Sequence, residues 1–156
     1  MPSGAQMPTQ TIPDTDRLRL RAFRRAAWVL HDCWDANGHP AHAVLHTRVI
    51  DHIVWQFTPV VGTSKKGGGH REHVVPLVRI QTLAFEEFAK GATFEDVGGM
   101  IGVLLRIAHI HPAEAKRLDQ DLGLKEVMPE GWSWRTGDPL ARLIRAEIEL
   151  VPSPAL

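Results

Sequence analysis

Apolar side chains recur every three to four positions near the N-terminus, at Phe23, Ala26, Ala27, Leu30, Cys33 and Trp34. This spacing places them on one face of an α-helix. One of the residues 14–16 can cap its start, and Asn37-Gly38 is typical of a helix end. Residues 1–13 contain three prolines among small polar residues, so we expect a disordered tail before this helix.

Proline, glycine and capping residues delimit further helices. Pro40 suits the first turn of a second helix, which we expect to run to about Phe57 and to stop before Pro59. Thr93 with Asp96 resembles a capping box. The same reasoning predicts helices over residues 77–90, 94–105, 112–122 and 139–149.

Two short apolar segments fit strands better than helices. Arg71–Val75 follows a glycine run and precedes Pro76, and Arg106–Ile110 follows a predicted helix. We expect residues 58–70 and 124–137 to be loops. The pattern as a whole predicts one mostly helical α+β domain over residues 14–150, with a small two-stranded sheet.

Composition narrows the range of functions. The chain has 156 residues, a formal net charge of zero, nine histidines and one cysteine. A balanced charge gives no global attraction to nucleic acid or membranes, so any such attraction must come from a local patch. A single cysteine excludes an intramolecular disulfide and a multi-cysteine zinc site. No apolar run is long enough for a membrane span and no signal peptide is evident, so we expect a cytoplasmic protein without a membrane partner.

The segment from Gly67 to Pro76 contains the densest group of side chains suited to catalysis or metal binding. Three glycines are followed by His70, Arg71, Glu72 and His73. Glu72 can bind a divalent cation and His73 can act as the base that activates water, while the cation neutralises charge on a phosphate. Neighbouring side chains of a strand point to opposite faces, so a bulge or a strand end is needed to bring both into one site. The alternative is that Glu72 lies in solvent and His73 is a structural residue.

The residues Glu72-His73-Val74-Val75-Pro76 resemble the first signature of the HNH, or ββα-metal (His-Me finger), endonucleases. The resemblance implies that His73 is the general base and that Glu72 binds a divalent metal such as Mg²⁺, Mn²⁺ or Zn²⁺. It also implies a second strand and a helix that supply the remaining ligand. Residues 106–110 and 112–122 fit those places, which points to His109, His111 or Glu114. The predicted helix carries no histidine of the kind that the family has there.

Two other histidine pairs have metal-binding spacing. His109 and His111 share one face if they lie on a strand, although His111 can equally cap the helix at Pro112. His42 and His46 lie one turn apart on the predicted second helix, where an exposed histidine face is the simpler interpretation. The metalloprotease motif is absent, because no glutamate follows His42.

Five arginines make the first helix basic, and Arg17, Arg21 and Arg24 share one of its faces. With Lys65 and Lys66 they form a candidate contact for nucleic acid or for an acidic protein, unless they are simply a solvated face. Trp132 and Trp134 in the loop 124–137 fit a clamp over the core better than a recognition surface.

Two functions remain as expectations. The first is an HNH-like, metal-dependent nuclease, or a degenerate relative of one, that acts on nucleic acid. The second is a non-catalytic binding protein of phage or mobile-element origin that inhibits another macromolecule, such as a nucleic-acid-binding protein. The acid–His–Pro signature favours the nuclease, and the missing helical histidine favours the binding protein.

Overall fold

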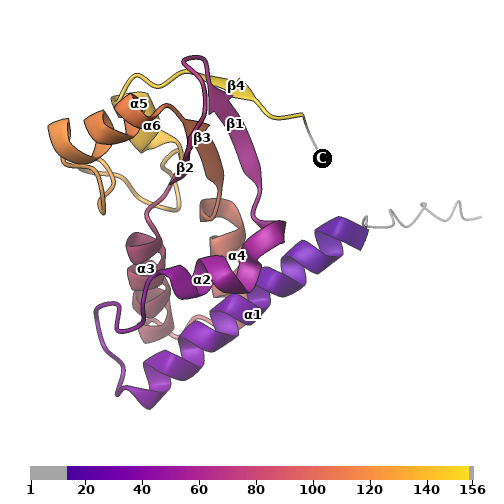
Figure 1. The fold of residues 1–156 in the computed structure, drawn as a ribbon. Coiled ribbons are helices and arrows are strands. Elements are labelled where there is room, and N and C mark those ends of the chain that lie inside the picture. Colours follow the sequence, from indigo (N-terminus) through magenta and orange to yellow (C-terminus); the bar gives the residue numbers. More distant parts are fainter. Residues whose placement is uncertain (1–13, 155–156) are drawn as a thin grey trace, which may run out of the picture.

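The computed structural model describes residues 14–154, and the predicted tail over residues 1–13 lies outside them. The fold is α+β and about 51% helical, with six α-helices and a four-stranded mixed sheet in the described part. Helices α1 to α4 gather on one side, and the sheet extends from them with α5 and α6 beside it (Figure 1). No helix within residues 14–154 is long and apolar enough to cross a membrane.

Three helices follow the predicted periodicity closely, namely α1 (Asp14–Ala36), α3 (Leu77–Ala89) and α4 (Phe94–Leu104). Their apolar faces form the core: Phe23 and Leu30 of α1, for example, are 3% and 0% exposed. The capping box at the start of α4 is confirmed, because Thr93 and Asp96 bond each other's backbone N–H. Gly98 and Gly102 lie against α1, where a Cβ atom would come within 3.2 and 3.0 Å of its atoms. These glycines weaken the helix intrinsically but allow α1 and α4 to pack closely.

The predicted second helix is wrong in its first half. Residues 40–47 are irregular, and only α2 (Arg48–Val54) and the 3-10 turn η1 (Trp55–Phe57) are helical. His39 has a φ of 62° and stacks on Trp34 with ring centroids 3.9 Å apart, so the chain turns sharply there. The backbone N–H of Leu45 bonds to the buried Gln81 side chain. These tertiary contacts replace the helix, and the expected helical pairing of two exposed histidines therefore does not form.

The sheet has four strands rather than two: β1 (Val60–Ser64), β2 (His70–His73), β3 (Ile107–Ile110) and β4 (Leu150–Pro152). Their order is β2-β3-β1-β4. Strands β1 and β3 are parallel, whereas β2 is antiparallel to β3 and β4 is antiparallel to β1. The expected loop over residues 58–70 thus contains β1, and both predicted strands are confirmed as the neighbours β2 and β3.

The C-terminal part consists of short elements, of which α5 and α6 lie beside the sheet (Figure 1). Helix α5 (Pro112–Lys116) continues into the π-helical turn η2 (Arg117–Asp121), and α6 (Ala141–Arg145) is much shorter than the predicted last helix. Residues 124–137 form the expected loop. Trp132 and Trp134 in this loop are partly buried and pack against the core, as expected of a clamp rather than of an exposed recognition surface.

Candidate functional site

The strand β2 lies at an edge of the sheet and borders a cavity of about 440 Å³. Helix α2 contributes Arg48 and Asp51 to the wall on one side, and the segment after α5 contributes Asp119 and Lys125 on the other. All four residues of β2, His70, Arg71, Glu72 and His73, line this cavity. Side chains on opposite faces of a strand normally serve different sites. Here an edge position and the end of the strand at His73 open both faces onto one space.

The carboxylate of Asp51 joins two side chains of β2. Arg71 donates hydrogen bonds to it from both terminal nitrogens, at 2.9 and 3.0 Å, and His73 Nε2 lies 3.1 Å from Asp51 Oδ1. Burial alone would raise the pKa of Asp51, but hydrogen bonds and charge from His73 and Arg71 outweigh burial and hold this pKa well below its usual range. An ionised carboxylate only accepts hydrogen bonds. In the neutral form of the imidazole, the Nε2 atom of His73 then carries the proton and Nδ1 is the basic nitrogen.

Glu72 points to the other side of β2 and is also held by two partners. Its Oε2 atom lies 3.0 Å from His70 Nε2, and its Oε1 atom accepts a hydrogen bond from Arg142 at 3.1 Å. The Glu72 side chain is only 12% exposed. The cavity thus has two carboxylate–imidazole pairs, one on each face of the strand.

Arg142 of α6 is the group that fixes this arrangement from behind. Its side chain is fully buried, and it donates to the backbone carbonyls of His73 and Leu124 at 2.8 Å as well as to Glu72. Burial lowers the pKa of the guanidinium, while the charge and hydrogen bond of Glu72 oppose that shift. A buried arginine is tolerated only when its donors are satisfied in this way.

Charges around the cavity nearly balance. Three cationic and four carboxylate side chains line it, and Arg142 stands behind one of the carboxylates. Recognition of a charged ligand would therefore depend on individual groups rather than on a broad field. Arg48 and Lys125 form no ion pair with any residue in the described part of the chain.

The two histidines expected to complete the site lie elsewhere. His109 pairs with Arg71 across β2 and β3, so it shares a sheet face with Arg71 and His73 without lining the cavity. His111 caps α5: its Nδ1 accepts from the N–H of Ala113 at 3.1 Å. Its own N–H donates to Glu114, which completes a capping box. The cavity brings together Glu72 and His73 but not the expected histidine ligand.

The donor set does not suit a divalent cation as the side chains lie. Both oxygens of Glu72 are engaged, one of them by a guanidinium that repels a metal ion. Both oxygens of Asp51 are engaged as well. Over residues 14–154 no group of three or more His, Cys, Asp or Glu side chains is placed to hold a metal.

The residues predicted to bind nucleic acid fall into two separate regions. Arg17 and Arg24 on α1 form ion pairs with Asp14 and Glu95. Lys65 and Lys66 lie on the tight turn between β1 and β2, at the far end of the sheet from α1 (Figure 1), and Lys65 pairs with Glu149. Glycines with φ angles of 103° and 115° at residues 67 and 69 shape this turn. A single patch made of both regions is therefore not present.

On α1, Arg21 and Arg25 have no ion-pair partner within the described residues. They line a shallow pocket of about 260 Å³ together with Arg24, Phe94 and the exposed Trp28. This is the part of the predicted basic helix that stays open to a ligand.

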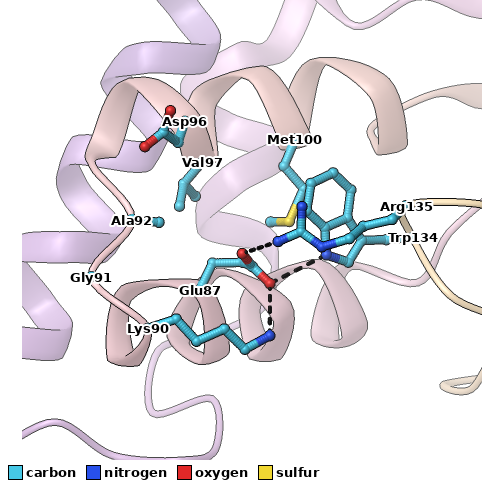
Figure 2. A pocket seen from close by; sticks show the side chains of 9 residues that line it. All are labelled: Glu87, Lys90, Gly91, Ala92, Asp96, Val97, Met100, Trp134 and Arg135. Atoms are coloured by element: carbon cyan, nitrogen blue, oxygen red, sulfur yellow. Dashed lines mark hydrogen bonds and ion pairs between the residues drawn. The ribbon is translucent and has the colours of Figure 1, made fainter.

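A second large cavity, of about 480 Å³, lies between α3, α4 and the loop 124–137, which contains Trp132 and Trp134. Figure 2 shows Glu87 at its wall, held by Lys90 at 3.0 Å and by Arg135 at 2.6 Å, with Trp134 Nε1 at 3.4 Å. Burial would raise the pKa of Glu87, but these three partners lower it below its usual value. Arg135 also stacks over the Trp134 ring at 4.4 Å. Since the Glu87 carboxylate is satisfied by these partners, the cluster is best explained as the anchor of the loop on α3.

No family model matches the chain, and comparison with curated proteins and with solved structures finds no match either.

Sequence reasoning missed Asp51 and Arg142, the two residues that organise the candidate site. Asp51 precedes His73 by 22 residues and belongs to helix α2, whereas His73 is on strand β2. Arg142 follows Glu72 by 70 residues. Nothing in the local pattern separates Arg142 from the exposed Arg145 on the same helix. A weak signal existed for Asp51, because it is a lone acid between the core residues Ile50 and Val54 of α2.

Proposed function

We propose that this protein cleaves phosphodiester bonds in nucleic acid, with His73 as the general base. The observation that carries the proposal is the Asp51–His73 pair, 3.1 Å apart at the wall of a 440 Å³ cavity. An imidazole oriented by a carboxylate is a common arrangement for removing a proton from a nucleophile. The resemblance of Glu72-His73-Val74-Val75-Pro76 to HNH endonucleases supports the same role for His73.

Each partner has a defined task in this mechanism. Asp51 holds the proton on Nε2, so Nδ1 of His73 can accept a proton from water or a hydroxyl group. The ionised carboxylate then stabilises the imidazolium that forms. Arg71 uses two of its five N–H donors on Asp51. The remaining donors can contact a phosphate oxygen and stabilise the charge that develops on it.

The test is cleavage of single-stranded and duplex DNA and RNA, each assayed with chelator, Mg²⁺, Mn²⁺ or Zn²⁺. His73→Ala should lower the rate by roughly 10²–10⁴-fold, the usual contribution of a general base. Asp51→Asn should also lower the rate, because an amide can donate to Nε2 and favour the wrong tautomer. His42→Ala is the matched control, since His42 is exposed and lies outside the cavity.

The metal series decides whether a divalent ion takes part, as the HNH resemblance implies. Cleavage that survives chelation would assign the reaction to the side chains alone. A wild-type protein that cleaves nothing under any of these conditions would overturn the enzymatic proposal.

A non-catalytic nucleic-acid-binding or inhibitory protein is the second candidate. The observation in its favour is that both carboxylate oxygens of Glu72 have partners, His70 and Arg142, so that Glu72 is not free to bind a metal ion. In that case the open arginines of α1 become the expected contact surface, and binding should persist in His73→Ala.

A further inference from the structure

A pocket of about 260 Å³, separate from the one on α1, adjoins the candidate site and contains Trp55. Its walls are Trp55, Gln56, Thr58, Val60, Arg71 and Ile107. Arg71 lines both this pocket and the site cavity. A ligand that contacts the guanidinium can therefore extend from one space into the other.

Trp55 is the most conspicuous residue of this pocket. Its side chain is 62% exposed although tryptophan is the largest apolar residue. Its backbone has a φ of 40° and a ψ of −112°, a conformation that non-glycine residues rarely adopt. Strained backbone of this kind occurs preferentially at ligand sites. The indole ring also lies nearly parallel to the ring of His52, with centroids 6.2 Å apart and an angle of 11°.

The remaining walls combine apolar and polar groups. Ile107 is 1% exposed and Val60 is 37% exposed. The hydroxyl of Thr58 is buried and has no hydrogen-bond partner within the described residues. A buried polar atom without a partner is uncommon. An exposed aromatic face, a partly apolar wall and a neighbouring guanidinium together match a nucleobase attached to a phosphate.

We propose that this pocket binds the base of a nucleotide next to the scissile phosphate, in a single-stranded segment. The base stacks on Trp55, and the connecting phosphate contacts Arg71. In a duplex the faces of the bases are already stacked, so only an unpaired base can use an open aromatic side chain. The inference rests on the proposed function, because the scissile phosphate is placed at His73.

The experiment uses unlabelled four-nucleotide strands, oligo-thymidine as DNA and oligo-uridine as RNA, with the His73→Ala variant so that no strand is cut. Stacking of a base on Trp55 should quench tryptophan fluorescence, and calorimetry should give the affinity. Trp55→Phe should bind within about threefold of its parent but lose the quenching, because phenylalanine still offers a ring for stacking. Trp55→Ala should bind roughly 5-fold to 150-fold more weakly, the range that stacking on an aromatic side chain gives.

Trp132→Phe is the matched control, since Trp132 lies in the loop 124–137 and lines neither the site cavity, nor the Trp55 pocket, nor the pocket on α1, and it should keep the quenching. Far-UV circular dichroism should show all variants folded, because Trp55 buries little surface. Unchanged affinity in Trp55→Ala, quenching that persists in Trp55→Phe, or absence of binding by the parent would overturn the inference. If quenching depends on Trp55 but the wild-type protein cleaves no strand, the base pocket is supported and the proposed nuclease function is wrong. If cleavage depends on His73 but not on Trp55, the nuclease function is supported and the base pocket is wrong.

Discussion

Replacement of Arg142 by methionine tests whether this buried side chain fixes the candidate site. The guanidinium is 0% exposed and donates to Glu72 at 3.1 Å and to the carbonyls of His73 and Leu124 at 2.8 Å. Methionine replaces the aliphatic stem of the arginine, but it has no donor and does not reach the place of the guanidinium tip. The change therefore removes the hydrogen bonds while it preserves the packing of the stem.

The expected cost follows from the groups that are left behind. Glu72 is 12% exposed, so its carboxylate would remain largely buried without its cation. Removing one partner of a buried ion pair destabilises a protein by about 3–5 kcal/mol. The two carbonyls would add to this unless water reaches them. A domain of this size is stable by about 5–15 kcal/mol, so the loss is a large share of the total and the variant should unfold at a much lower urea concentration than the wild type.

Urea unfolding followed by circular dichroism at pH 7 measures the loss. Arg145→Met on the same helix is the matched control, and because Arg145 is exposed it should change the free energy of unfolding by no more than about 0.5 kcal/mol. Adding Glu72→Gln to Arg142→Met should recover part of the stability, since it removes the unpaired charge. An Arg142→Met protein within about 1 kcal/mol of the wild type would refute the assignment of Arg142 as the anchor.

Two further predictions concern pH and the basic helix. The folded-state pKa of Asp51 is lowered, so its contribution to stability is fully present above its unfolded pKa of about 4 and is lost as the pH falls below that value. The difference in urea midpoint between wild type and Asp51→Asn should therefore shrink from pH 7 to pH 3, and a constant difference would contradict the pairing. Arg21→Glu combined with Arg25→Glu should weaken oligonucleotide binding and flatten its salt dependence, whereas Arg17→Glu should do so much less because Arg17 already pairs with Asp14. Unchanged binding of the double variant at low salt would exclude α1 from the interface.

The helices that the sequence predicts well are those with a long apolar period and clear caps. In α1 and α3, local propensity and burial favour the same structure, so the sequence and the fold agree. In α4 the capping box and the apolar period indicate the helix although its glycines weaken it. The second helix fails because Leu45 and His39 make tertiary contacts that an isolated segment cannot make. Local periodicity carries no information about such contacts.

The strands show a different limit. Strand β1 has five residues, includes Gly62 and lacks clear alternation, and its partner β3 lies far along the chain. Strand β4 has three residues and contains Pro152, which an edge strand tolerates. Neither β1 nor β4 has a local sequence pattern that distinguishes it from a loop, so the sequence predicts only two of the four strands.

At the candidate site, the sequence predicts the residues that share one segment and misses those that come from others. Glu72 and His73 could be named because they stand together after a glycine run. Their partners Asp51 and Arg142 are ordinary charged residues on helices, and only the fold shows that one faces His73 and that the other is buried. The sequence also placed His111 correctly as a helix cap in one of its two interpretations.

The parallel pairing of β1 with β3 dictates when the candidate site can assemble during synthesis. Val60 pairs with Ile107, so the centre of the sheet cannot form by a local turn and must wait for β3 to emerge. Arg142 comes later still, 70 residues after Glu72. At about 5–20 residues per second, a ribosome needs roughly 4–14 s to add that stretch. During this interval the nascent chain already contains Asp51 and His73 but lacks the side chain that holds strand β2 in place, so the site can form only after Arg142 has been made.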